Sequence, residues 1–186
     1  FRHNTVVGNL PANAFATRIN REVDNPPIEA IRFVHNIFSD PTGTMQDFSD
    51  TLPADLSVVR PSLLLRNAYF NAASPLPNDP ADVLNITGDA QRIEGNPQLP
   101  AQTNLTLPFW LPNQSQFNGG FNRIRDVFVA LVESYGRPVA GSVAFGAAAV
   151  AADIPVTDIL GNARTSVDAD LGAVQRVDAG FRNGFE

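Results

Sequence analysis

Apolar residues recur at helical spacing near the start of the chain, between residues 26 and 39. The recurring positions are Ile28, Ile31, Val34, Ile37 and Phe38. On an α-helix they would form one apolar stripe. Asn25 suits the N-cap position, and Pro26 suits the first helical position, where its missing N–H is not needed. Because Asp40-Pro41-Thr42-Gly43 follows as a stop signal, the pattern predicts a helix over 26–39.

Most of the other apolar runs are short and separated by turn-forming residues, which is typical of β-strands. Residues 56–70 hold two apolar stretches on either side of Arg60-Pro61, and residues 104–111 alternate between apolar and polar side chains. Residues 83–93 alternate more weakly. Three prolines within residues 74–80 predict a loop, because proline removes a backbone donor and restricts its neighbours.

Residues 123–135 fit two patterns. Apolar side chains at Ile124, Val127 and Leu131 match a helical stripe, and Gly136 is a good helix stop signal. Residues 127–132 are also a continuous apolar run rich in β-forming residues, as in a strand buried on both faces. We favour strands here, since a hairpin about residues 136–138 would also explain the apolar segment 139–150.

No repeat with a period of 20–50 residues is evident, which argues against solenoids and propellers. The length of 186 residues suits a single domain, with residues 1–24 and about 153–186 as possible arms. The sequence therefore predicts a mainly β fold, sandwich or jelly-roll-like, with one helical insertion at about 26–39 and irregular arms. A mixed α+β fold is the alternative.

Charge and composition narrow the classes of partner. The chain has a net charge of −6, no cysteine and no lysine, so that all 13 basic residues are arginines. These arginines are scattered singly, whereas nucleic-acid binding normally needs a basic patch or arm. Direct binding of nucleic acid is not expected. No apolar run approaches the ~20 residues of a membrane-spanning helix, so no transmembrane segment is expected.

The sequence contains no catalytic, cofactor-binding or metal-binding motif that we would assign. The two histidines, His3 and His35, form no ligand-spaced pair and are expected to be a polar residue near the end and a residue on the flank of the predicted helix. Residues 118–120 are expected to form a turn and not a phosphate-binding loop. Asp168-Ala169-Asp170 resembles part of a calcium loop but lacks the closing Glu, so a solvated turn is expected.

Glu133 is the most interesting carboxylate. It lies within the apolar run that ends at Tyr135, where burial would raise its pKa and make it a candidate general acid. The alternative is that Glu133 faces water or pairs with an arginine. We favour this alternative.

Residues 107–112 form a dense apolar patch flanked by prolines. If the patch is exposed, Phe109, Trp110 and Leu111 form a candidate interface, because soluble domains avoid large exposed apolar patches without a function. If it is buried, the same residues belong to the core. The pattern leaves both alternatives open.

Low charge, abundant Asn and Pro, and the lack of a catalytic motif favour a structural or assembly subunit of an extracellular or viral protein shell, such as a capsid or coat protein. It would act through self-association, with other shell proteins as further possible partners, and without a cofactor. One alternative is a secreted hydrolase using Glu133. Another is a β-sandwich module that binds a ligand or carbohydrate through Trp110.

Overall fold

The computed structural model describes residues 1–8, 17–18, 28–50, 59–60, 63–82, 84–148, 154–165 and 167–177. The strands in these ranges are β1 (Thr5–Val7), β2 (Thr17–Arg18), β3 (Ile28–Glu29), β4 (Arg32–Val34), β5 (Ile37–Ser39), β6 (Ser49–Asp50), β7 (Val59–Arg60), β8 (Leu63–Leu65), β9 (Ala68–Phe70), β10 (Ile93–Glu94), β11 (Trp110–Leu111) and β12 (Gln116–Phe117). The helical segments are α1 (Ile124–Leu131), a following π-helical turn η4 (Val132–Gly136) and the short 3₁₀ turns η2 (Ile86–Gly88) and η3 (Pro112–Gln114).

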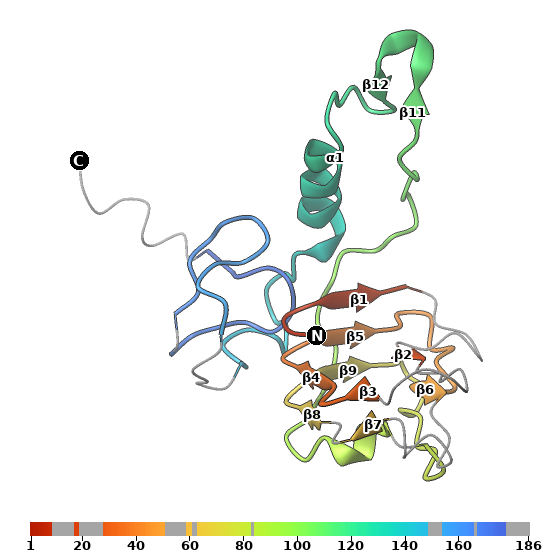
Figure 1. The fold of residues 1–186 in the computed structure, drawn as a ribbon, viewed down its shortest axis with the longest axis vertical. Coiled ribbons are helices and arrows are strands. Elements are labelled where there is room, and N and C mark those ends of the chain that lie inside the picture. Colours follow the sequence, from red (N-terminus) through yellow and green to blue (C-terminus); the bar gives the residue numbers. More distant parts are fainter. Residues whose placement is uncertain are drawn as a thin grey trace.

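Strands β1 to β10 pair in parallel with strands one coil away along the chain. A four-stranded sheet has the order β1-β5-β9-β10, and Figure 1 shows the first three of these strands side by side. Thr5 pairs with Ile37 and Ile37 with Ala68, at spacings of 32 and 31 residues. The pairs β2·β6, β3·β7 and β4·β8 have the same offsets. The chain therefore winds in successive coils that stack on one another, which is the architecture of a parallel β-solenoid.

The expectation that no repeat of 20–50 residues exists is thus wrong. What recurs from coil to coil is backbone conformation: His3, His35 and Arg66 all have a positive φ, at 50°, 58° and 52°. An Asn follows each of them, at Asn4, Asn36 and Asn67. The paired strand residues differ in identity, so that the period shows in the sequence only at these turns.

The interior of the coils is filled with apolar side chains, largely aromatic. The buried residues of this core are Phe33, Phe38, Phe48, Leu64, Tyr69, Leu84 and Ile86. Phe38 stacks on Tyr69 of the next coil, with ring centroids 5.7 Å apart, and Phe48 packs edge-on against both rings. Stacking between coils therefore adds aromatic contacts to the backbone pairing of the strands.

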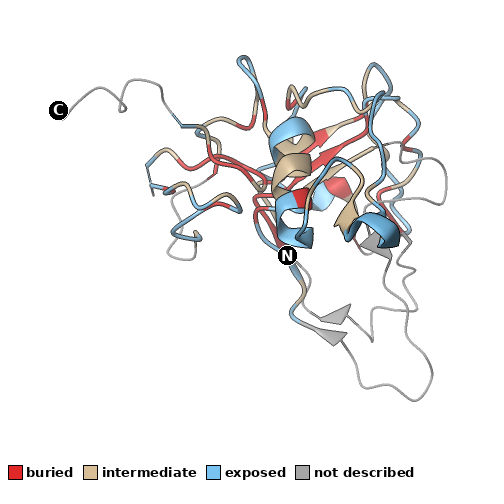
Figure 2. Cartoon of the chain, turned by 90° about the horizontal axis from the view of Figure 1, so that it is seen from above, coloured by how far each residue is buried: buried red, intermediate tan, exposed pale blue. Residues whose placement is uncertain are grey.

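The opposite face of the four-stranded sheet is covered by residues 144–148 and 169–172, here called the covering segment. Ile37 and Ala68, whose neighbours Phe38 and Tyr69 face the interior, pack against Ala144, Ala148, Ala169 and Leu171. Gly172 donates its N–H to His35 O at 2.9 Å. The central strands β5 and β9 are therefore packed on both faces, and the buried segments gather near the middle of the molecule in Figure 2.

Burial on both faces explains why the predicted helix over 26–39 is wrong. Residues 28–39 form β3, β4 and β5, and residues 26–27 lie outside the described residues. In a two-sided strand, adjacent residues such as Ile37 and Phe38 are both apolar. The left-handed turn at His35 separates β4 from β5, so that the inside–outside alternation of side chains is not continuous from one strand to the next. The apolar residues of the two strands together therefore fall at a spacing close to that of a helix.

The strand interpretation of residues 123–135 is also wrong, since this segment forms α1 and η4. Its helical stripe and the stop signal at Gly136 were the correct alternative. Within 104–111 only Trp110–Leu111 is a strand, and 139–148 contains none. Residues 74–80 form no helix or strand, as predicted.

The predicted fold class is confirmed only in part. Strands are present, but they are short and lie in a few small sheets beside α1, so that the described residues form a mixed α/β structure. They do not form a clear sandwich or jelly roll.

Candidate contact surface

Residues 104–136 project from the coil stack as a separate arm, which contains β11, β12 and α1 (Figure 1). Strands β11 and β12 pair antiparallel, with Trp110 opposite Phe117. Asn118 orders the base of this hairpin. Its Oδ1 accepts from Phe109 N at 2.7 Å, and its Nδ2 donates to Leu107 O at 3.2 Å. The hairpin is therefore a defined structure, held by backbone and amide groups.

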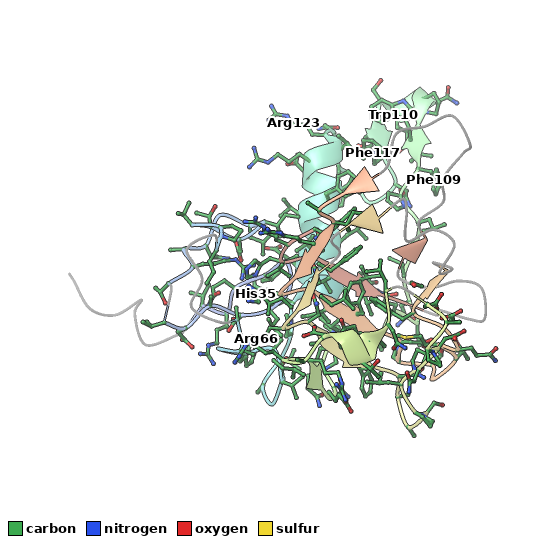
Figure 3. All side chains as sticks on the ribbon, turned by 60° about the horizontal axis from the view of Figure 1, so that its bottom comes forward. His35, Arg66, Phe109, Trp110, Phe117 and Arg123 are labelled. Atoms are coloured by element: carbon green, nitrogen blue, oxygen red, sulfur yellow. The ribbon has the colours of Figure 1, made fainter. Side chains whose placement is uncertain are left out.

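The arm exposes large apolar side chains. Leu107 is 74% exposed, Phe109 54% and Trp110 45%. Trp110 packs edge-on against Phe117, with ring centroids 5.0 Å apart, and Figure 3 shows these aromatic residues on the arm. Of the two alternatives for residues 107–112, the exposed patch is observed at Leu107, Phe109 and Trp110, whereas Leu111 is half-buried. An exposed set of this kind indicates a contact site.

Helix α1 continues the exposed apolar surface. Ile124 is 50% and Phe128 59% exposed, while Val127 on another face of the helix is buried. Ile124 and Phe128 border an apolar groove of about 320 Å³, whose other side includes Ile159 and Leu160. An isolated helix in water does not leave such a face bare without a cost in free energy. We call this groove face and residues 107–111 together the apolar arm surface.

Glu133, considered as a general acid, lies on η4 and is exposed. The general-acid hypothesis required a buried carboxyl group, and Glu133 is not buried. The favoured alternative, in which Glu133 faces water, agrees with the structure.

His3 and His35 are brought together by the coil stacking, contrary to the expectation of two separate polar positions. Both are buried, and His35 Nδ1 lies 3.3 Å from His3 Nε2. Arg66 occupies the equivalent place in the third coil and donates its Nε to Ala147 O at 2.5 Å. Figure 3 shows His35 and Arg66 on the same side of the coils. The imidazole pair therefore joins two coils, and Arg66 joins the third to the covering segment.

A ladder of amides runs beside these residues. The backbone N–H and Nδ2 of Asn4 donate to Oδ1 of Asn36 at 2.9 and 3.0 Å. Asn36 repeats both bonds to Asn67, and Asn67 repeats them to Oδ2 of Asp89. Asn36, Asn67 and Asp89 are almost fully buried. Because unsatisfied buried amides are costly, the ladder fixes the register of the coils.

Three carboxylates form a candidate cation cluster. One oxygen from each of Asp47, Asp79 and Asp82 lies within 4.8 Å of the others. Asp47 and Asp79 are one coil apart, so the coil offset of 32 residues is the only sequence signal that could have found them. Together they supply three of the about six to eight oxygens that Ca²⁺ prefers. We assign no ion to this cluster.

The turn at 168–170 is part of a buried polar network, not the solvated turn expected. Asp170 is fully buried and accepts backbone N–H bonds from Gly146 at 2.7 Å and Arg176 at 2.6 Å. Burial raises its pKa. Asp168 pairs instead with the guanidinium of Arg176. Both carboxylates therefore have protein partners that hold the covering segment in place.

Asp158 and Arg164 extend this network. Burial acts to raise the pKa of Asp158, but hydrogen bonds from Asn162, Gln175 and Leu160 outweigh it and lower that pKa. Arg164 donates to Asp170 O at 2.8 Å and to Gly172 O at 2.7 Å, and burial lowers its pKa. The network stabilises the backbone of the segment that covers the sheet.

No family model matches the chain, and no curated protein matches it in sequence. In the described ranges, every helix is too short or too polar to cross a membrane.

Proposed function

We propose that this chain is a structural module that assembles through protein–protein contacts, with the apolar arm surface as its interface and a second copy of the chain as its partner. The observation that carries the proposal is the exposure of Leu107, Phe109 and Trp110 on a projecting, ordered hairpin. Burying such side chains against a partner gains about 25 cal/mol per Å² of apolar surface.

A second copy suits this surface because the interface would be self-complementary. Aromatic and aliphatic side chains lie on the same arm, so that a two-fold pairing can place the hairpin of one copy against the α1 groove of the other. Charges of both signs, such as Arg123 and Asp126, lie at the start of α1. The pairing therefore needs no partner of opposite net charge.

The setting that we propose is an extracellular or viral protein shell. The support is the combination of a stacked core with a projecting contact element, because repeated contacts in a lattice need a rigid body and an accessible arm. The scattered arginines favour protein partners over nucleic acid.

A carbohydrate-binding module is a second candidate, favoured by what surrounds Trp110. The exposed indole lies on a hairpin that also carries amide side chains, including Gln114 and Gln116, which bond to each other at 2.9 Å. An aromatic plane beside amide donors and acceptors is a common way to bind a sugar ring.

Light scattering after size exclusion over a range of protein concentration tests both candidates. We expect the wild type to form an oligomer, and the double variant Phe109→Ser, Trp110→Ala to stay monomeric. Val156→Ser is the matched control, because Val156 is 81% exposed but lies outside the arm. A wild type that is monomeric at every concentration would contradict self-association. Quenching of the single tryptophan by oligosaccharides would then support the second candidate.

A further inference from the structure

The coil stack uses the same set of hydrogen bonds between each pair of neighbouring coils. The first residue of β5, β9 and β10 donates to the O of the ladder Asn in the coil before it: Ile37 N to Asn4 O at 2.8 Å, Ala68 N to Asn36 O at 2.8 Å, and Ile93 N to Asn67 O at 2.9 Å. Each ladder Asn also donates twice to the ladder side chain of the next coil. These repeated bonds define what a coil offers to its neighbour.

At the β1 end of the stack, the same groups are present but no coil occupies the neighbouring position in the described residues. β1 is the terminal strand of its sheet. Because Asn4 O and Gly8 N bond towards β5, the N–H groups of Thr5 and Val7 face the free edge. Asn4 Oδ1, which corresponds to the double acceptor of Asn36, receives no donor from the described residues.

The aromatic stack is open at the same end. Phe1 stacks on Phe33 with centroids 5.0 Å apart and an interplanar angle of 8°, yet Phe1 itself is 73% exposed. A groove of about 340 Å³ lies between this edge, at Asn4, Thr5 and Val7, and side chains of α1 and η4 that face it, among them Phe128, Leu131 and Tyr135. Backbone, amide ladder and aromatic stack therefore all end in groups that a further coil would satisfy.

The opposite end of the ladder is closed. Asp89 accepts the two bonds from Asn67 at Oδ2, and its Oδ1 accepts Arg66 N and Gln91 N. A carboxylate has no N–H with which to continue the ladder. The β10 end of a second copy therefore does not present the amide donors that Asn4 Oδ1 would need.

We propose that the free edge of β1 binds an extended polypeptide segment in parallel register, and that this segment carries the coil pattern of a left-handed residue, an Asn and a short strand. The Asn would donate its N–H and Nδ2 to Asn4 Oδ1 and accept Thr5 N–H at its carbonyl. This is β-strand addition to an open sheet edge. The partner is a strand-forming segment and not the terminal coil of another copy.

A peptide with the sequence of residues 32–40 provides the test, because it carries the left-handed residue, the Asn and the strand of the second coil. Hydrogen exchange of the full chain is measured by NMR with and without millimolar peptide. We expect exchange of the Thr5 and Val7 amides to slow at least tenfold. The same peptide with Asn36→Ala should bind about fivefold more weakly, since it loses one amide bond. All substitutions are in the peptide, so the fold of the protein is unchanged.

Three results would overturn the proposal. One is unchanged exchange of Thr5 and Val7 at saturating peptide. Another is equal affinity for the Asn36→Ala peptide, which would indicate apolar contact alone. The third is slowing of the same two amides by raised protein concentration without peptide, which would identify a second copy as the occupant. The double variant Phe109→Ser, Trp110→Ala should bind the peptide like the wild type, which separates this site from the exposed hairpin residues 107–111, although Phe128 of α1 lines both grooves.

Discussion

Asn36 donates both its backbone N–H and its Nδ2 to the same oxygen, Oδ1 of Asn67, at 2.9 Å each. The two residues are 31 positions apart and both are almost fully buried. A single acceptor that receives two donors from one residue sets the offset between coils as well as their distance. Slipping the register by one residue would leave buried amides unsatisfied and would turn every strand side chain to the wrong face.

Asn67→Ala should destabilise the protein by about 3 kcal/mol, because it removes a double acceptor and leaves the buried donors of Asn36 without it. Asn67 Nδ2 also donates to Phe33 O at 3.0 Å, so a bond to the coil before is lost as well. Denaturant unfolding measures the change. Asn122→Ala is the control, since Asn122 is exposed, and a loss for Asn67→Ala no larger than that of the control would contradict a structural ladder.

Gly172→Ala should destabilise the protein by about 3 kcal/mol. A Cβ at this position would lie 2.6 Å from both Ile37 Cδ1 and Thr5 Oγ1, and the φ of 80° is unfavourable for alanine. Gly141→Ala isolates the clash, because Gly141 has a similar φ of 88° but open space around its Cβ position. Thermal unfolding should show a clearly lower Tm for Gly172→Ala. Equal losses in the two variants would mean that the covering segment does not pack closely on the sheet.

The sequence predicted the presence of short β-strands and the loop at 74–80 but not the way in which the strands pair. Parallel pairing joins residues 31 or 32 positions apart, and nothing local marks Thr5, Ile37 and Ala68 as neighbours. A strand can be recognised from its sequence pattern when one of its faces is exposed to water. Here both faces are buried, and the polar alternation that would mark a strand is missing.

The residues of the candidate sites also divide into those that the sequence could predict and those that it could not. The apolar patch at Phe109 and Trp110 was visible from its composition, because its residues are contiguous. The pairing of His3 with His35 and the grouping of Asp47 with Asp79 depend on the coil offset and could not be found without it. The recurring His-Asn and Arg-Asn dipeptides at 3–4, 35–36 and 66–67 are the one signal that could have revealed the period.

Asp158 should make the protein sensitive to acid. Its folded pKa is lowered below the ordinary value of 3.8, so its stabilising contribution is present above pH 3.8 and is lost as the pH falls through the folded pKa. Asp158→Asn should therefore be less stable than the wild type at pH 7, and the difference should shrink below pH 3.8. Urea unfolding across this range measures it. If the wild type and Asp158→Asn differed in stability by the same amount at every pH, the carboxylate charge would not contribute to stability.

Asp170 belongs to the same network, but its contribution to stability should change with pH in the opposite direction. Its folded pKa is raised by burial, so its contribution is fully present below pH 3.8 and is lost as the pH rises through the folded pKa. The free energy of unfolding of the wild type, relative to that of Asp170→Asn, should therefore fall as the pH rises above 3.8. Over the same pH range, the difference between the wild type and Asp158→Asn should stay constant. The same slope for the two variants would contradict the assignment.

The apolar arm surface should contribute little to the stability of the coil stack. Trp110 packs on Phe117 within the arm and is 45% exposed, so Trp110→Ala removes few buried contacts and should change the free energy of unfolding by less than about 1 kcal/mol. Phe38→Ala, in the coil interior, should cost about 3 to 5 kcal/mol. Both are measured by denaturant unfolding of the monomer at low concentration. A loss for Trp110→Ala that approaches that of Phe38→Ala would mean that the arm is part of the folding core and that its exposed side chains are not available for a partner.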